Sequence, residues 1–262
     1  MRNLFGYLGR SFINFLQTLS SLYYLFAETL VQSFVLLSDR RKRTQAGILA
    51  QVNEIGTQSL PLVLTVAALL GIALTVLISF QLKAVGGYNY IPGFVTMAVV
   101  REMGPLITSL IIAGRVGAAF TARIGTMKVS EEILALETMA INPVRFLVVQ
   151  RFIGLLISLP ALTLLAGFTA LFGGFLFGSA RLGIRTDTYV RETLDVLIIT
   201  DIYSGVVKAV VFAVVIVMIG CYRGLVVEGG AEEVGKATML SVVSSTLTII
   251  VLDTFMTTAF YG

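Results

Sequence analysis

The sequence predicts an all-α integral membrane protein with an N-terminal interfacial amphipathic helix, five transmembrane helices and a short cytoplasmic helix between spans two and three. Of the 262 residues, 56% are hydrophobic and only 13% are charged, against about 25% charged residues in soluble domains. The mean hydropathy is +0.92, and long uncharged runs recur along the chain. So little polar surface excludes a soluble enzyme and a nucleic-acid-binding protein.

Residues 1–44 are predicted to form an interfacial amphipathic helix and a basic linker. Apolar residues recur every three or four positions from Leu4 to Leu30, and a basic cluster follows at residues 39–43. This pattern is typical of a helix that lies in the membrane interface beside anionic headgroups. A secretory signal peptide is disfavoured because the apolar part is too long and lacks a cleavage motif. A sixth span over residues 11–37 is the other alternative, since Glu28 is its only charge.

Residues 45–262 contain five apolar segments long enough to cross a bilayer, which takes about 20 residues. The predicted spans are residues 57–82, 94–121, 150–180, 204–222 and 238–260. Span three is longer than an upright crossing and contains Pro160, so it tilts or kinks. Two half-spans around Pro160 are the alternative.

The connections between the spans predict the orientation of the chain in the membrane. Those on the N-terminal side hold 12 Lys and Arg residues, and those on the opposite side hold 4. Because cytoplasmic connections carry the excess of basic residues, we expect the N-terminus in the cytoplasm and the C-terminus outside it.

We predict no catalytic residue, metal site or cofactor in this chain. It has no histidine, which is the commonest metal ligand and general base, and Cys221 is its only cysteine. The segment from Gly230 to Thr238 nearly matches the phosphate-binding pattern G-x-x-x-x-G-K-[ST], but Ala237 follows Lys236 and a membrane span precedes the segment. The match is therefore interpreted as chance, and the chain is not expected to hydrolyse ATP.

Four charged residues lie in the outward half of the predicted spans: Arg101, Glu102, Lys208 and Asp253. Arg101 and Glu102 are about 12 Å from the outer surface at 1.5 Å per helical residue. Charges inside a bilayer are costly and usually functional. Because the four charges sum to zero, we predict a paired polar layer between spans two, four and five. The layer is either structural or changes its pairing as the protein works.

The cytoplasmic connection between spans two and three predicts a helix of about twelve residues. Ser130 is a good N-cap, Glu131 and Glu132 suit the first turn, and Asn142-Pro143 ends the helix. The segment is too short and too charged to span a membrane. A stiff helix at the cytoplasmic face suits docking into the groove of a soluble partner, and a connector lying on the bilayer is the alternative.

Three motifs resemble the MlaE/YrbE family of ABC-transporter permeases, to which the chloroplast lipid-importer permease is similar. They are Arg101–Pro105, Ala113–Ala119 and Glu131–Pro143, and the likeness continues through Gly235–Thr238 and the last span. The resemblance covers about residues 45–262, which form the MlaE-like permease domain. The chain departs from the family at Arg123, where members often carry an acid, so the contact with the ATPase would use a different charge pairing.

The resemblance implies the permease subunit of a lipid ABC transporter. The permease would be a homodimer that binds two copies of a separate cytoplasmic ATPase, with a mammalian-cell-entry (MCE) domain protein across the membrane and phospholipid or a related lipid as cargo. The short cytoplasmic helix would be the coupling helix, with ATPase contacts at Glu131, Glu132, Leu134, Glu137 and Met139. The membrane would be the bacterial inner membrane or, alternatively, the plastid inner envelope.

A transported lipid needs an apolar wall for its tails and a polar patch for its headgroup. We expect that pocket in the outward half of the dimer, lined by Leu74, Leu77, Ile78 and Gln81 of span one and by Val99, Glu102 and Met103 of span two. Two other functions stay open: an ATP-independent carrier or channel, which needs an ion or proton relay across the bilayer, and a non-transporting scaffold that recruits partners through residues 130–142.

Overall fold

The computed structural model describes residues 2–38, 42–83 and 86–262, and within these ranges it contains helices and no strand. The elements are α1 (Arg2–Ser38), α2 (Lys42–Lys83), η1 (Tyr88–Tyr90), α3 (Ile91–Ala98), η2 (Val99–Met103), α4 (Gly104–Ile112), η3 (Ala113–Gly117), α5 (Ala118–Val129), α6 (Glu132–Thr138), η4 (Val144–Val148), α7 (Val149–Leu182), α8 (Thr186–Val196), α9 (Ile199–Leu225) and α10 (Ala231–Tyr261). Three of them, η2, η3 and η4, are single π-helical turns set within longer helices.

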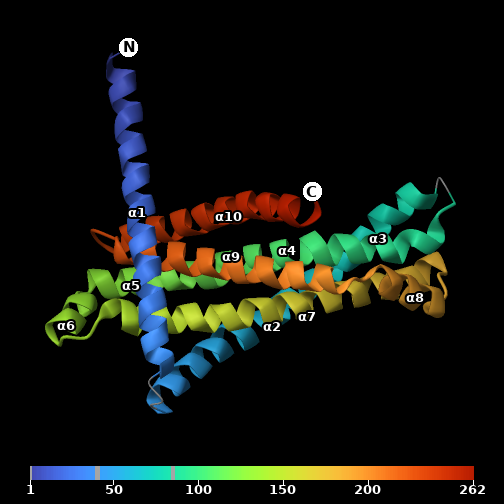
Figure 1. The fold of residues 1–262 in the computed structure, drawn as a ribbon, viewed down its shortest axis with the longest axis horizontal. Helices are drawn as coiled ribbons and strands as arrows, with labels where there is room; N and C mark the ends of the chain where they lie inside the picture. Colours follow the sequence, from blue (N-terminus) through green and yellow to red (C-terminus); the bar gives the residue numbers. More distant parts are fainter. Residues whose placement is uncertain (1, 39–41, 84–85) are drawn as a thin grey trace.

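Among the described residues, five helical stretches are long and apolar enough to cross a membrane, which confirms the predicted number of spans. They are Gly47–Lys83, Tyr88–Val129, Val144–Leu182, Ile199–Leu225 and Ala231–Tyr261. They run along the long axis of the molecule (Figure 1). α7 continues through Pro160 as one helix, so the alternative of two half-spans is wrong.

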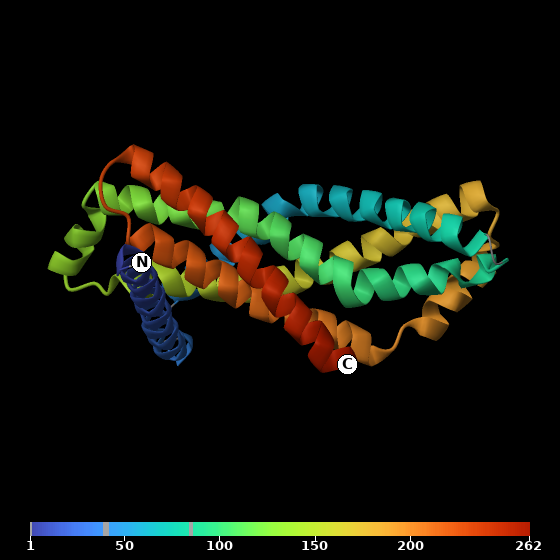
Figure 2. The same cartoon turned by 90° about the horizontal axis from the view of Figure 1, so that it is seen from above.

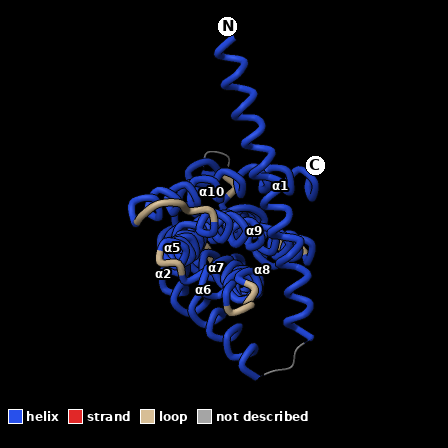
Figure 3. The backbone as a smooth tube through the Cα atoms, turned by 90° about the vertical axis from the view of Figure 1, so that its left-hand side faces the viewer, coloured by secondary structure: helices blue, strands red, loops and turns tan. Residues whose placement is uncertain are grey.

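α1 lies across the bundle near the end that carries α6, rather than along it (Figures 1 and 3). Its buried residues Leu25, Thr29 and Ser33 face the bundle, and the ring of Phe26 packs edge-on against Phe152 of α7 at 6.4 Å. α1 is not among the five described helices apolar enough to span. A helix that lies along the membrane surface requires this crosswise placement. Most of the basic cluster at 39–43 lies outside the described residues.

Small residues bring the backbones of α2 and α7 into direct contact. A Cβ added to Gly71 would lie 1.8 Å from the carbonyl oxygen of Ala170, and one added to Gly173 would lie 2.4 Å from that of Ala68. Close approach through small residues is how membrane helices associate without a hydrophobic driving force. The two helices therefore form one closely packed unit.

The predicted cytoplasmic helix is shorter than expected and begins later. α6 has seven residues, because the helix of span two runs on to Val129 and Ser130 ends it, donating its N–H to the Thr126 oxygen at 2.9 Å. The expected N-cap at Ser130 and the expected length are therefore wrong. α6 ends at a left-handed residue, Ala140 (φ 58), with a hydrogen bond from the Ile141 N–H to the Leu136 oxygen at 2.9 Å, which is a Schellman motif.

At the opposite end, the residues between the predicted spans three and four, 181–203, are expected to be an extramembrane connection. The structure forms an 11-residue helix there, α8. Tyr189 fastens α8 to α7: it is buried, its ring packs at 5.3 Å against that of Phe175, and Gly178 leaves space for it. Burial raises the pKa of the Tyr189 phenol to about 12, so the ring stays neutral.

Candidate functional site

A fully buried lysine, Lys208 of α9, is the centre of the candidate site. Its Nζ lies 2.7 Å from Oε2 of Glu102 in η2 and 2.8 Å from Oδ1 of Asp253 in α10, and its side chain has 0% exposure. α9 approaches η2 closely at Gly205, where a Cβ would lie 3.2 Å from the Val100 oxygen. One ammonium group therefore joins three of the five spans.

Two further oxygens surround the same ammonium group. Lys208 Nζ donates to Oγ1 of Thr257 at 2.7 Å and to the carbonyl oxygen of Arg101 at 3.1 Å. That carbonyl is available because the residue four positions on, Pro105, has no N–H to donate. Thr257 Oγ1 in turn donates to Glu102 Oε2 at 2.9 Å. An ammonium group has three protons, so all of them have acceptors.

A second ion pair lies beside this cluster. Arg101 approaches Asp201 of α9 through two nitrogens, with Nε 2.9 Å from Oδ1 and Nη2 3.1 Å from Oδ2. The Tyr261 hydroxyl donates to Asp201 Oδ1 at 3.2 Å, and the Arg101 guanidinium lies 4.8 Å from the centre of the Tyr261 ring. The side chain of Asp201 is 4% exposed, so this carboxylate is desolvated and needs its partners.

The structure thus brings the side chains of Glu102, Lys208 and Asp253 together, whereas the Arg101 side chain pairs with Asp201 instead. The predicted span four begins at residue 204, so Asp201 is not among the expected intramembrane charges. The structure includes Asp201 in α9. With it, the two neighbouring clusters contain two cations and three carboxylates. A signal was present: Asp201 and Lys208 are seven positions apart, and Asp253 and Thr257 are four apart. These spacings put each pair on one helix face.

The predicted lipid-contacting residues lie on several surfaces of the single chain. On α2, Leu77 is 57% exposed and Gln81 is exposed, whereas Leu74 and Ile78 are half-buried. On η2, Val99 is fully buried and Met103 lines a small cavity against α2 and α7. Glu102, whose side chain is 31% exposed, is the one of the seven that also belongs to the polar cluster.

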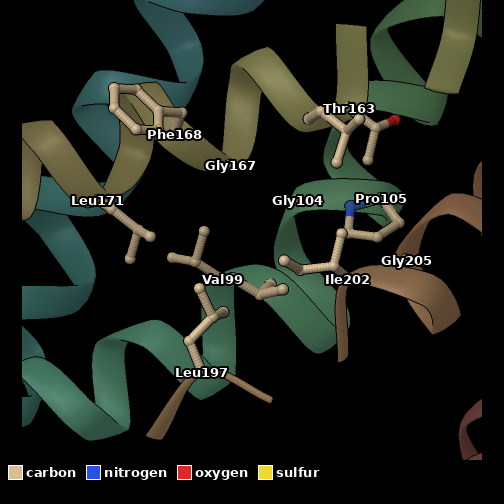
Figure 4. Close-up of a pocket in the computed structure, with 12 residues that line it drawn as sticks. Val99, Gly104, Pro105, Thr163, Gly167, Phe168, Leu171, Leu197, Ile202 and Gly205 are labelled. Atoms are coloured by element: carbon tan, nitrogen blue, oxygen red, sulfur yellow. The ribbon is translucent and has the colours of Figure 1, made fainter. Parts of the chain in front are cut away.

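An apolar pocket of about 250 Å³ lies between the span that contains η2, α7 and α9 (Figure 4). Its lining residues are Val99, Val100, Gly104, Pro105, Thr163, Leu164, Gly167, Phe168, Leu171, Leu197, Ile202 and Gly205. Val99 is the predicted lipid-contacting residue that this pocket includes. A Cβ added to Gly167 would meet nothing within 4 Å, so the pocket has room beside this residue.

The family described as Permease MlaE matches residues 48–259. The chain belongs to the MlaE permease family. A probable ABC transporter permease protein of Rickettsia typhi is 36% identical over 210 residues, which are 80% of this chain and 81% of the relative. MlaE-family relatives include the intermembrane phospholipid transport system permease protein MlaE of Haemophilus influenzae, 32% identical over 221 residues, 82% of this chain and 83% of the relative. The protein TRIGALACTOSYLDIACYLGLYCEROL 1, chloroplastic, of Arabidopsis thaliana is 32% identical over 213 residues, 81% of this chain and 61% of the relative.

The matched region includes all five spans, and this confirms the resemblance predicted from the three motifs. The chain is therefore an ABC transporter permease and a multi-pass membrane protein. The near match to a phosphate-binding loop in this MlaE-family permease forms the first turns of α10 rather than a loop. Its Lys236 pairs with Glu232 at 2.9 Å and with Glu233 at 2.8 Å.

The residues predicted to contact an ATPase lie on the outer surface of α6 and at its ends. Glu131, Glu132 and Glu137 are exposed, Leu134 is 55% exposed and Met139 is 61% exposed. Buried Ile133 and half-buried Leu136 attach α6 to the bundle, and Asn142 donates to Glu28 of α1 at 2.9 Å. α6 therefore presents two apolar side chains among three carboxylates at the end of the bundle.

Proposed function

We propose that this chain is the transmembrane permease subunit of an ABC transporter that moves phospholipid or a related lipid between the membrane and an MCE-domain partner, driven by a separate cytoplasmic ATPase. It works as a homodimer in the bacterial inner membrane, or in the plastid inner envelope. The observation that carries this proposal is the family match over residues 48–259, which spans the entire membrane bundle. The names of the Haemophilus and Arabidopsis relatives favour a lipid as cargo.

The shape of α6 supports docking of an ATPase. Its seven residues are held to the bundle through Ile133, so movement of the helix also moves the end of α5. Exposed Leu134 and Met139 suit insertion into an apolar groove, and the surrounding carboxylates suit a basic rim. Arg123 pairs with Glu54 of α2 in this chain, so it is engaged away from α6.

The way the single chain divides the predicted lipid wall supports the proposed dimer. Leu77 points outward from α2 while Val99 is enclosed between helices, so one chain does not form both sides of a pocket with these residues. α10 is the least buried of the five spans, with 22% of its most apolar window inside the bundle. A second copy packed against these exposed faces supplies the opposite wall.

In the proposed mechanism, the bundle moves as a rigid body and carries motion from α6 to its other end. ATP closes the partner ATPases, the α6 helices move together, and the backbone contact between α2 and α7 carries the motion to the outward half. There the pocket opens or collapses around the lipid. Arg101 and Glu102, with side-chain exposures of 29% and 31%, are the members of the polar cluster that a headgroup reaches.

The first experiment reconstitutes the permease with its ATPase and compares L134R with L194R. Leu194 is an exposed leucine, 61% against 55% for Leu134, at the opposite end of the bundle on α8. We expect L134R to abolish lipid-stimulated ATP hydrolysis and L194R to leave it intact, with equal thermal stability. For the unaltered chain, ATPase binding without stimulation by lipid would indicate a scaffold. No ATPase binding to the unaltered chain would indicate an ATP-independent carrier.

The second experiment tests the lipid wall with photoreactive side chains at Leu77 and at Leu69. Both are exposed on α2 of the single chain, at 57% and 61%, so both are accessible to a photoreactive test of lipid contact. We expect ATP to change the yield of lipid adducts at Leu77 and not at Leu69. Adducts at Leu77 that do not respond to ATP, with responsive adducts elsewhere in the bundle, would exclude this wall.

A further inference from the structure

A second pocket lies far from the Lys208 cluster, in the angle between α1 and the bundle. Its volume is about 570 Å³, and it is formed by α1, α9 and α10. Its lining residues are Thr18, Leu19, Leu22, Tyr23, Phe26, Val214, Val215, Met218, Ile219, Tyr222, Arg223, Ser244 and Thr248. Figures 1 and 2 show α1 crossing the bundle at this end, with its N-terminal half extending beyond α10.

The pocket changes from apolar to polar along α9. Val214, Val215 and Met218 form its deeper part, and Tyr222 and Arg223 lie two turns further, in the last turns of the helix. The distance from Val215 to Arg223 along the helix axis is about 12 Å. An apolar wall that ends in a cation and hydroxyl groups matches a phospholipid, with its tails beside the wall and its phosphate at the basic end.

Arg223 has fewer or weaker polar partners than the other arginines that reach a neighbouring helix through hydrogen bonds. Arg115 donates to two neutral oxygens of α2, Ser59 Oγ at 2.5 Å and Gln58 Oε1 at 3.3 Å. Arg101 and Arg123 each pair with a carboxylate, Asp201 and Glu54. The partner of Arg223 among the described residues is the neutral hydroxyl of Ser244, at 3.4 Å. A half-buried guanidinium without a carboxylate has the capacity for an anionic oxygen from outside the chain.

We propose that this pocket binds one anionic phospholipid of the cytoplasmic leaflet, with its phosphate on Arg223 and its acyl chains against α9 and α1. The lipid fills the angle between α1 and the bundle and so fastens the interfacial helix to α9 and α10. It is a bound lipid and not the cargo, because the Glu102–Lys208 pair lies at the other end of the spans. The assignment of this lipid to the cytoplasmic leaflet rests on the expected orientation of the chain. The negative charge of that leaflet agrees with an anionic lipid at this site.

Native mass spectrometry of the delipidated full chain in detergent tests the headgroup contact. We expect retention of added phosphatidylglycerol over phosphatidylcholine, and R223Q should reduce that preference about fivefold, which corresponds to about 1 kcal/mol per basic residue. R223K should retain most of the preference. K128Q removes the same charge from an exposed residue at the same end of the bundle, outside the pocket, and should change nothing. An unchanged preference in R223Q overturns the proposal.

A second variant tests the acyl-chain contact without changing charge. Ile219 is half-exposed and lines the pocket, and I219W should reduce retention of both lipids, with thermal unfolding in detergent confirming that the variant is folded. Undiminished retention of both lipids by folded I219W overturns the proposal.

A photoreactive side chain at Leu22 should form lipid adducts in membranes. Adducts to a second copy of the chain in place of lipid would assign the pocket to a protein interface. ATP hydrolysis by the complex is a separate readout, so failure here leaves the transport proposal to its own experiments.

Discussion

The two ends of the bundle hold their ion pairs in different ways. In the half of the bundle away from α6, Lys208 has 0% exposure and contacts two carboxylates at 2.7 and 2.8 Å. Near α6, Arg123 pairs with the single carboxylate of Glu54 among the described residues, and their side chains are 54% and 32% exposed. A desolvated charge must be fully partnered, whereas water solvates an exposed one. The half with Lys208 therefore satisfies its charges internally, while the end with α6 carries exposed charged groups.

Loss of the central cation should give the largest effect. K208M leaves the buried Asp253 beside the partly exposed Glu102 without the lysine that both contact, and breaking a buried pair in this way costs about 3–5 kcal/mol. We expect a steep fall in the free energy of unfolding, measured by denaturant titration in detergent. A loss below about 1 kcal/mol would remove the contrast between the two ends of the bundle.

The double charge reversal K208D/D253K separates pairing from the mere presence of charge. Each single reversal places like charges together, while the double variant returns opposite charges to positions whose side chains lie 2.8 Å apart. We expect the double variant to be more stable than either single variant and to recover lipid-stimulated ATP hydrolysis. A double variant no better than the singles would show that Glu102 and Thr257, rather than Asp253, hold the lysine.

The pair of Arg101 and Asp201 should matter less, because Arg101 is 29% exposed. D201N keeps the shape of the side chain but removes the charge that receives the guanidinium fork, so we expect a loss of about 2 kcal/mol, as for hydrogen bonds to charged groups. Y261F removes the phenol hydroxyl, which contacts Asp201 Oδ1 at 3.2 Å and Ser204 Oγ at 2.6 Å, but leaves the ion pair, and should cost about 1 kcal/mol. Equal losses in the two variants would assign the effect to Tyr261 and not to the ion pair.

At the end of the bundle with α6, removing backbone strain should give a measurable gain in thermal stability. Glu131 adopts φ 60 just before α6, a conformation that costs a residue with a Cβ about 1 kcal/mol relative to glycine. E131G should therefore raise thermal stability slightly, and A140G (φ 58) should behave alike at the other end of the helix. A fall in stability in both variants would mean that α6 depends on these side chains more than on its backbone.

The exposed ion pair should give the smallest effect. R123Q breaks the contact with Glu54, and exposed pairs contribute about 0–1 kcal/mol. Unfolding midpoints of R123Q and the unaltered chain should agree closely, and raising the salt concentration should bring them together. A loss as large as that of K208M would show that solvation does not distinguish the two ends.

The spans could be predicted from the sequence because each depends on its own composition. Long apolar runs determine their number, and the five stretches found agree with the five expected. The limits of α6 were harder to predict. Ser130 has the chemistry of an N-cap, but α5 continues to Val129 and uses the Ser130 N–H for its own last turn. Competition between two adjacent helices for one residue is not visible in a local pattern.

The candidate site divides in the same way. That Glu102, Lys208 and Asp253 need partners follows from their chemistry, since charges within a bilayer are costly. That Arg101 turns to Asp201, with 2.9 Å between Nε and Oδ1, depends on the π-helical turn η2 and on the approach of α9. Residues 201 and 253 are far apart in sequence from 101 and 102, so only helix packing selects among them.

The sequence by itself determined that this chain enters a membrane, how many times it crosses, and to which family it belongs. These properties are sums over local composition and short motifs. Tertiary structure alone decided which acid meets which base, where α6 begins, and that α1 encloses a pocket with α9 and α10. Those outcomes depend on distances of a few ångströms between segments remote in sequence, which are set by close packing of the whole bundle.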